Sequence, residues 1–289
     1  MKPNKIIYFG TPDFSAQILE ALIKTPDNKV VGVVTQPDRP VGRKRILTPA
    51  PVAQIATQYN LPLFKLNKLD QSNLQHIKLL QPDIFLVVAY GQIIPKSWLD
   101  TPKIATLNIH FSLLPKYRGA LCVSEAIKNQ DPETGITLMR MDEQLDHGPI
   151  IKQLKQKIDI NDNVATLTRK LTQKAIELIP HLKVRNFEVK PQNQQKATYT
   201  PVTRSRTRQS AFIPSKKVYP SSRVNNPQKL HALIRSLNPD PGAWTKIHGQ
   251  ELKILQTKLL KNKLEITQVQ LPGKNPISWQ QFLAGHQSG

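Results

Sequence analysis

The chain contains the stretch Ile84-Phe-Leu-Val-Val-Ala89, an apolar run without a break. Such a run is typical of a strand that is buried on both faces, as in the middle of a parallel sheet. Further short apolar runs at 5–9, 30–35 and 104–109 alternate with helical patterns, such as the one over 164–178. This alternation predicts an α/β fold with a mostly parallel, Rossmann-like sheet and helices on both sides of it.

The next predicted strand along the chain ends in two polar residues, Asn108 and His110. Side chains two positions apart in a strand share a face, so the carboxamide and the imidazole project side by side. An amide can donate to an oxyanion, and an imidazole can move a proton at neutral pH. The same residue types also fit a buried turn Asn and a core His. Their place at a strand end, where open α/β sheets bind ligands, favours a catalytic pair.

A carboxylate beside His110 would favour the imidazolium and fix the orientation of the ring. The loop from Asp142 to Gly148 lies between two predicted strands and offers candidates. We prefer Asp146, while Asp142 and Glu143 remain alternatives, and a solvated loop charge is the other interpretation. The pattern alone does not order these three carboxylates.

Val88, Tyr90 and Gly91 stand at the end of the central apolar strand. We interpret them as a wall for a flat, apolar ligand, with ordinary core packing as the alternative.

The segment 36–47 is a predicted polar loop with the cationic side chains Arg39, Arg43, Lys44 and Arg45. We expect this loop to reach a phosphate backbone, the alternative being a solvated basic loop.

The charge of the chain is strongly positive, with 41 Lys and Arg against 20 Asp and Glu and a formal net charge of +21. The excess is concentrated between residues 185 and 261, where fifteen basic residues face only Glu188, Asp240 and Glu251, a net +12. A generally basic composition would spread the charge more evenly. The clustering therefore favours a nucleic-acid partner.

A length of 289 residues suggests two domains. We expect a catalytic domain over 1–185, a basic linker over 186–226 and a small β-barrel-like domain over 227–289. The linker is inferred from its few apolar residues and many Gln, Ser, Arg and Pro. The last domain is inferred from an amphipathic helix at 228–237 and the short strands that follow it.

Several classes of protein are disfavoured. The single Cys122 excludes an internal disulfide and a Cys-rich zinc site, and the seven His do not pair at metal-ligand spacing, so we expect no metal. The first apolar run, Ile6–Phe9, is too short for a signal peptide, and no run is long enough to span a bilayer. We expect a cytoplasmic monomer without a membrane partner.

Several motifs together resemble the methionyl-tRNA formyltransferase family. They are Phe9-Gly-Thr-Pro-Asp-Phe14, Thr35-Gln-Pro-Asp-Arg-Pro40, Val88-Ala-Tyr-Gly-Gln92, the block 107–119, Glu133-Thr-Gly135, the segment 141–148 and the turn 238–245. The resemblance extends from about residue 5 to residue 285. The central block alone would identify only the wider folate-dependent formyltransferase superfamily.

This resemblance implies a formyl donor, 10-formyltetrahydrofolate, and an acceptor, the methionine amine of initiator Met-tRNA, in translation initiation. It implies a carboxyl-terminal domain similar to an OB barrel and a basic loop at 36–47 that enters the acceptor-stem region. It implies that the catalytic residues are Asn108, His110 and Asp146, and that the folate site is lined by Ser112, Leu113, Leu114 and Pro115.

Two other functions remain as alternatives. One is a folate-dependent formyltransferase that acts on a small amine, such as a sugar nucleotide or glycinamide ribonucleotide. The basic second half argues against it, because a small acceptor needs no such charge. The other is a non-catalytic RNA-binding relative, against which the presence of Asn108, His110 and Asp146 argues.

Overall fold

The computed structural model describes residues 3–42, 44–183, 188–202, 205–219, 225–261 and 263–285. Contacts between backbone positions divide the chain into two compact units. Unit 1 runs to Arg118 and includes Gly135–Gln156 and Arg169–Tyr199, whereas unit 2 contains Gly119–Thr134, Lys157–Thr168 and the chain from Thr200 onward. The expected domains over 1–185, 186–226 and 227–289 stay a prediction.

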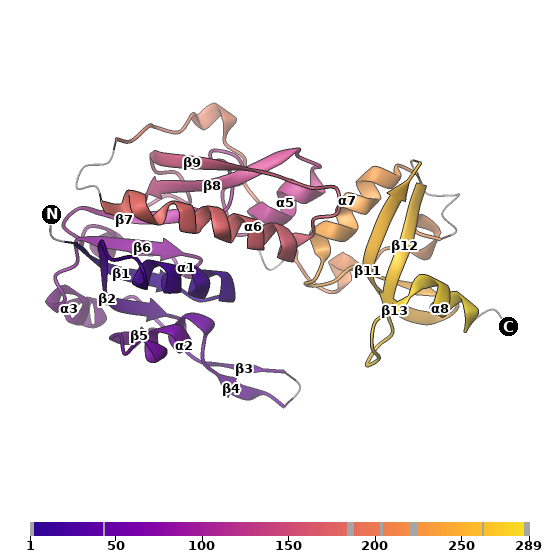
Figure 1. The fold of residues 1–289 in the computed structure, drawn as a ribbon, viewed down its shortest axis with the longest axis horizontal. Coiled ribbons are helices and arrows are strands. Elements are labelled where there is room, and N and C mark those ends of the chain that lie inside the picture. The colour runs from indigo at the N-terminus through magenta and orange to yellow at the C-terminus, as the bar shows by residue number, and fades with distance from the viewer. Residues whose placement is uncertain are drawn as a thin grey trace. The chain divides into compact units, whose positions relative to one another are not determined.

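Unit 1 is built on a seven-stranded sheet in the order β5-β2-β1-β6-β7-β8-β9. Figure 1 shows the strands in this order, with β9 at the top and β2 and β5 below. Neighbours from β5 to β7 pair in parallel, and β8 runs antiparallel to β7. The predicted mostly parallel sheet is therefore confirmed. The strands are β1 Asn4–Gly10, β2 Asn28–Thr35, β5 Leu63–Lys65, β6 Ile84–Val88, β7 Ala105–His110, β8 Glu133–Arg140 and β9 Ile150–Lys157.

The helices between these strands follow the apolar spacing of the sequence. In α6 the residues Leu167, Leu171 and Ala175 are all buried, as expected for one face of a helix. Helix α1 starts at Asp13 after a Pro12 N-cap, and no side chain caps it. The helices are α1 Asp13–Ile23, α2 Pro51–Gln58, α3 Gln71–Leu79, α4 Lys96–Leu99 and α6 Val164–Glu177.

Strand β6, which contains most of the apolar run Ile84–Ala89, lies at the centre of the sheet. All five of its residues are buried. Phe9 of β1 packs against Phe85 with ring centroids 4.9 Å apart and meets Tyr90 edge-on at 5.6 Å. Helix α1 lies so close to the end of β1 that a Cβ at Gly10 would come within 2.0 Å of Ser15 Oγ. Only glycine allows this approach.

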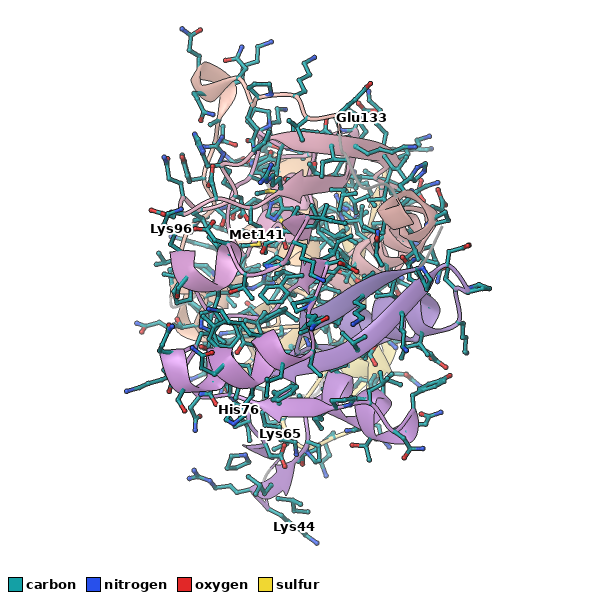
Figure 2. The ribbon with its side chains drawn as sticks, turned by 90° about the vertical axis from the view of Figure 1, so that its left-hand side faces the viewer. Lys44, Lys65, His76, Lys96, Glu133 and Met141 are labelled. Carbon is teal, nitrogen blue, oxygen red and sulfur yellow. The ribbon has the colours of Figure 1, made fainter. Side chains whose placement is uncertain are left out.

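The basic segment 36–47, predicted as a loop, forms a two-stranded hairpin of β3 Arg39–Val41 and β4 Ile46–Thr48. Figure 1 shows the hairpin extending away from the sheet, and Figure 2 shows Lys44 at its far end. The strands are short and exposed, which is why the sequence shows no apolar pattern strong enough to distinguish them from a loop.

Unit 2 contains a four-stranded antiparallel sheet in the order β10-β11-β12-β13, consistent with the predicted small barrel. Helix α7 packs against α5 and β11. The elements are α5 Cys122–Lys128, α7 Pro227–Leu237, β10 Trp244–Ile247, β11 Gln250–Leu260, β12 Lys263–Gln270, β13 Ile277–Ser278 and α8 Trp279–Ala284.

Part of the stretch predicted as a linker is packed in unit 2. Short 3₁₀ helices form at Gln209–Ala211 and Ser215–Lys217, and the nearby Ile213 and Val218 are buried in the apolar core of the unit. Few apolar residues are needed to anchor a segment when each of them is fully covered.

His231 is a buried histidine on α7 with an oxygen close to each ring nitrogen. Nδ1 of His231 lies 2.7 Å from Thr257 Oγ1, and Nε2 lies 2.8 Å from the carbonyl oxygen of Ile160. Burial lowers the pKa of His231 below its ordinary value of 6.5, the hydrogen bond to the Ile160 carbonyl opposes this, and the nearby Arg235 lowers the pKa further. The neutral imidazole is therefore the form that fits the folded chain.

We expect the free energy of unfolding to fall as the pH drops below about 6.5, because the unfolded chain then binds a proton at His231 that the folded chain resists. The loss continues until the lower pKa of the folded state is reached. Replacing His231→Gln removes this term, so urea unfolding of the variant should show a smaller loss between neutral and mildly acidic pH. Equal pH slopes for the two proteins would contradict the assignment.

Candidate active site

Strand β7 places the predicted catalytic pair between two neighbouring strands. Asn108 is opposite Val87 of β6 on one side and Met139 of β8 on the other, and His110 is opposite Thr137. Both polar side chains are largely covered, with 8% of each residue exposed. The structure thus puts a carboxamide and an imidazole on one face of the strand end, as the spacing predicted.

The imidazole of His110 faces an oxygen at each ring nitrogen. Nε2 lies 2.9 Å from the carbonyl oxygen of Tyr117, and Nδ1 lies 3.6 Å from Oδ2 of Asp146. A carbonyl oxygen can only accept, so Nε2 carries a hydrogen. A second proton on Nδ1 is favoured by the carboxylate beside it. The surroundings therefore suit the imidazolium, a donor at both nitrogens.

The geometry orders the three carboxylates that the sequence left open. Asp146 lies against His110, whereas Asp142 accepts a hydrogen bond of 2.7 Å from His147 Nδ1 and Glu143 lies 3.5 Å from Lys96 Nζ. Asp146 adopts a left-handed backbone conformation with φ of +47°. This conformation is uncommon for a residue other than glycine, although Asp tolerates it better than most.

Gly148 lets the loop that carries Asp146 fold close against the end of β8. A Cβ at this position would lie 1.9 Å from the carbonyl oxygen of Arg140. Arg140 N in turn donates to the Pro149 carbonyl at 3.0 Å. The loop is thus fixed to β8 by a close approach that a larger residue would prevent.

The loop after β7, predicted to line a folate site, is held by the hydroxyl of Thr137. That hydroxyl donates to the Ser112 carbonyl at 2.7 Å, accepts from Leu114 N at 3.1 Å, and accepts from Gln153 Nε2 at 2.8 Å. Gln153 also donates to the Leu114 carbonyl at 2.9 Å. Ser112 and Leu114 are buried, while Leu113 and Pro115 are partly exposed. These four residues form a braced turn beside the catalytic pair.

Val88, Tyr90 and Gly91, at and just after the end of β6, differ in how far they are exposed. Val88 is buried, and the ring of Tyr90 is buried beside Phe9, where burial raises the pKa of Tyr90 to about 12. The Tyr90 carbonyl accepts hydrogen bonds from Thr11 Oγ1 at 2.9 Å and Gln36 Nε2 at 3.3 Å. Gly91 is exposed with φ of +87°. A role in ligand binding stays a prediction for Val88, Tyr90 and Gly91.

The cationic residues of the β3–β4 hairpin are exposed. Arg39 donates to Gln36 Oε1 at 3.0 Å and keeps its place at the base of the hairpin, while Lys44 and Arg45 lie in the turn. Arg43 falls outside the described residues. In Figure 2 Lys44 lies well apart from Met141, which follows β8 and whose N donates to the Thr106 carbonyl of β7. The hairpin tip and the catalytic pair are therefore separate features of unit 1.

Within the described ranges, no group of three His, Cys, Asp or Glu side chains is arranged to hold a metal ion. None of the helices in the described part of the chain combines the length and the apolar content needed to cross a membrane.

The structure adds residues that the sequence did not indicate, among them Tyr117, Thr137 and Gln153. Tyr117 contributes the backbone carbonyl that accepts from His110 Nε2, and a pattern of side chains in the sequence does not indicate backbone contacts. Thr137 could have been found from the pairing register of β8, because it lies directly opposite His110. Gln153 is brought to this site by β9 and had no local signal.

The chain matches the model of a family described as formyl transferase over residues 4–182, and the model of a formyl transferase carboxyl-terminal domain over residues 225–265. It is 38% identical over 265 residues to the methionyl-tRNA formyltransferase of Staphylococcus epidermidis, covering 90% of this chain and 81% of that protein. It is 41% identical over 268 residues to the methionyl-tRNA formyltransferase of Staphylococcus aureus, covering 90% and 82%.

Solved structures share the fold. An N-formyltransferase from Helicobacter canadensis, in a complex with folinic acid and dTDP-3-aminofucose, has a TM-score of 0.61 at 22% identity and covers 89% of this chain and 88% of its own. A 4-N formyltransferase from Francisella tularensis has a TM-score of 0.64 at 17% identity and covers 87% and 96%.

Removal of the Thr137 hydroxyl tests the bracing of the turn. Thr137→Val leaves the Ser112 carbonyl and Leu114 N without this partner, so we expect a loss of about 1–3 kcal/mol in the free energy of unfolding, measured in urea. Thr137→Ser keeps the hydroxyl and should cost clearly less. A loss in Thr137→Ser that equals or exceeds the loss in Thr137→Val would contradict this role of the hydroxyl, because Thr137→Ser keeps the hydroxyl and removes only the methyl group.

Proposed function

The chain belongs to the methionyl-tRNA formyltransferase family, and from this premise we propose that it transfers a formyl group from 10-formyltetrahydrofolate to the amino group of methionine on initiator Met-tRNA. The observation that carries this function is the identity of 38–41% to methionyl-tRNA formyltransferases over 90% of the chain. The region 225–265 matches the carboxyl-terminal domain of formyl transferases, which agrees with formyl transfer.

The reaction requires charge stabilisation and proton transfer. The methionine amine attacks the formyl carbon, a new carbon–nitrogen bond forms, and the formyl oxygen gathers negative charge until the bond to the donor nitrogen breaks. We assign the role of donor to that oxygen to the Asn108 amide and to the Nε2–H of His110, which turns to the substrate from the Tyr117 carbonyl that accepts it in this structure. The amine loses one proton and the departing nitrogen gains one, so the proton balance needs a single shuttle.

His110 is the proposed shuttle because an imidazole can gain and lose a proton near neutral pH. Asp146 stabilises the charged ring and holds its orientation at 3.6 Å. The donor itself supplies the activated formyl group. Its predicted binding turn is Ser112–Pro115, which is braced by Thr137 and Gln153 and partly exposed at Leu113 and Pro115.

The positive charge of the chain supports Met-tRNA as the acceptor. The exposed side chains of Arg39, Lys44 and Arg45 offer cations on a hairpin that extends away from the sheet (Figure 1). Residues 185–261 add a net charge of +12. A small amine, the alternative acceptor, would need neither feature, and the non-catalytic alternative would not need the arrangement around His110. Cytoplasmic location and a monomeric state stay predictions.

The function is tested by a formylation assay with 10-formyltetrahydrofolate, in which Met-tRNA is compared with small amines such as sugar nucleotides. We expect Met-tRNA to be formylated in strong preference. Formylation of a small amine alone would overturn the proposed acceptor.

The catalytic roles are tested in the same assay. We expect His110→Ala to abolish formyl transfer and Asn108→Ala to lower the rate roughly 10²–10³-fold through loss of an oxyanion donor. Met-tRNA affinity should remain within a few fold in both. The matched control is His76→Ala, which removes an exposed imidazole from α3. Normal turnover of His110→Ala would contradict the proposed mechanism.

The electrostatic part of the proposal is tested by salt titration of Met-tRNA binding. Each phosphate that is neutralised contributes about −0.9 to the slope of log K against log salt on duplex RNA or DNA, and ~−0.7 on a single strand. We therefore expect a steep slope that becomes shallower by about one to two in the double variant Lys44→Ala with Arg45→Ala. Lys174→Ala serves as the control, because its Nζ already pairs with Glu177 at 2.9 Å. An unchanged slope in the hairpin variant would exclude the hairpin as a phosphate contact.

A further inference from the structure

A short segment of unit 1, Lys190–Tyr199, contacts both loops that supply the partners of His110. We refer to it as the strap. It lies within the stretch that the sequence predicts to be a linker, and Figure 1 shows it in salmon above β9. Its first residue is joined to the start of β9 by two backbone hydrogen bonds, Ile150 N to the Lys190 carbonyl at 2.8 Å and Lys190 N to the Ile150 carbonyl at 2.7 Å.

The far end of the strap is joined to the loop after β7. Thr198 N donates to the Pro115 carbonyl at 3.1 Å, Tyr117 N donates to Thr198 Oγ1 at 2.8 Å, and Arg118 N donates to the Thr198 carbonyl at 2.8 Å. The carbonyl that accepts from His110 Nε2 belongs to Tyr117. The strap therefore holds the backbone on both sides of one partner of the imidazole.

Gln192, in the middle of the strap, is joined to the loop that supplies the other partner. Its residue is 6% exposed, and its Nε2 donates to the Asp146 carbonyl at 2.8 Å and to the Gly148 carbonyl at 2.7 Å. Its Oε1 accepts from Arg118 Nε at 3.2 Å and from Nη2 at 2.7 Å. Both hydrogens and the oxygen of one carboxamide are thus engaged.

The guanidinium of Arg118 is itself fixed. Arg118 is 1% exposed, and besides Gln192 it donates to Gln194 Oε1 at 2.9 Å and to the Tyr199 hydroxyl at 2.9 Å. A buried cation that loses an acceptor is strongly penalised, so this side chain keeps a single position. Arg118 follows Tyr117 directly in the chain and so gives Gln192 a rigid support at the loop after β7.

We propose that Gln192 is a positioning residue for formyl transfer, which holds the carboxylate of Asp146 toward His110 by clamping the carbonyls of residues 146 and 148. Asp146 has a φ of +47°, a conformation that persists in a non-glycine residue when the surroundings impose it. The Gln192 amide supplies that constraint, and Arg118 orients the amide. This inference rests on the proposed function for its kinetic test.

One substitution separates the two roles of the carboxamide. Gln192→Glu keeps oxygens for Arg118 and adds a charge that attracts it, but it has no hydrogen to donate to the carbonyls of Asp146 and Gly148. We expect kcat to fall roughly 10–100-fold, because small displacements of catalytic groups have large rate effects. The KM values for donor and Met-tRNA should stay within about threefold, since the Gln192 amide is buried and is engaged by the carbonyls of residues 146 and 148 and by Arg118.

A double-mutant cycle with Asp146→Asn tests whether Gln192 acts through Asp146. In the Asp146→Asn protein the further change Gln192→Glu should alter kcat less than about twofold, because the group that it positions is already disabled. The matched control is Gln194→Glu. Gln194 is exposed and accepts from the same guanidinium. Its Glu variant keeps an acceptor oxygen for Arg118 and leaves the Gln192 amide in place, so it should keep the kcat of the parent.

A crystal structure of Gln192→Glu supplies a test that does not depend on turnover. We expect Asp146 Oδ2 to move away from His110 Nδ1. Gln192→Asn, which is too short to reach the two carbonyls, replaces this variant if Gln192→Glu does not fold. A kcat equal to that of the parent, an undiminished effect in the Asp146→Asn background, or an unmoved loop 146–148 would overturn the inference. A parent protein that formylates no Met-tRNA, together with a displaced loop, would reject the proposed function and still support the positioning role.

Discussion

The site of this protein depends on one interaction, the placement of the His110 imidazole between two acceptors. The Tyr117 carbonyl lies at one ring nitrogen and the Asp146 carboxylate at the other. A partly buried imidazolium is stable only where its charge and both of its N–H groups are matched. This requirement determines where the two neighbouring loops must lie, and most of the further contacts in the site serve to hold those loops.

The sheet provides the fixed side of this arrangement. Strand β6 is buried along its whole length, and its parallel partner β7 ends in the proposed catalytic pair, Asn108 and His110. The antiparallel strand β8 then returns beside β7, which brings Thr137 opposite His110 and carries the chain into the loop of Asp146.

Neutral side chains hold parts of both loops. Gln153 and Thr137 brace the turn after Ser112, and Gln192 joins the Asp146 loop to Arg118. Carboxamides can donate and accept at once, so each connects two backbone segments without adding a charge beside the imidazolium. Because these side chains are neutral, they add no second carboxylate beside His110. Among the described ion pairs, Asp146 is the carboxylate that lies within 4.0 Å of the imidazole.

The sequence by itself determined the α/β class, the strand that bears the pair, and the adjacency of Asn108 and His110, because strand periodicity is a local property that a few residues express. It did not distinguish Asp146 from Asp142 and Glu143, since all three stand in one polar loop and differ only in backbone direction. It assigned the strap to a linker, because Gln, Asn and Lys have the composition of a solvated segment. Only the tertiary structure brought Gln192 to Arg118, 74 positions away, and gave that polar segment partners. Contacts between residues so far apart in the chain produce no periodic pattern in a single sequence. They form because buried polar groups need hydrogen-bond partners in the folded chain.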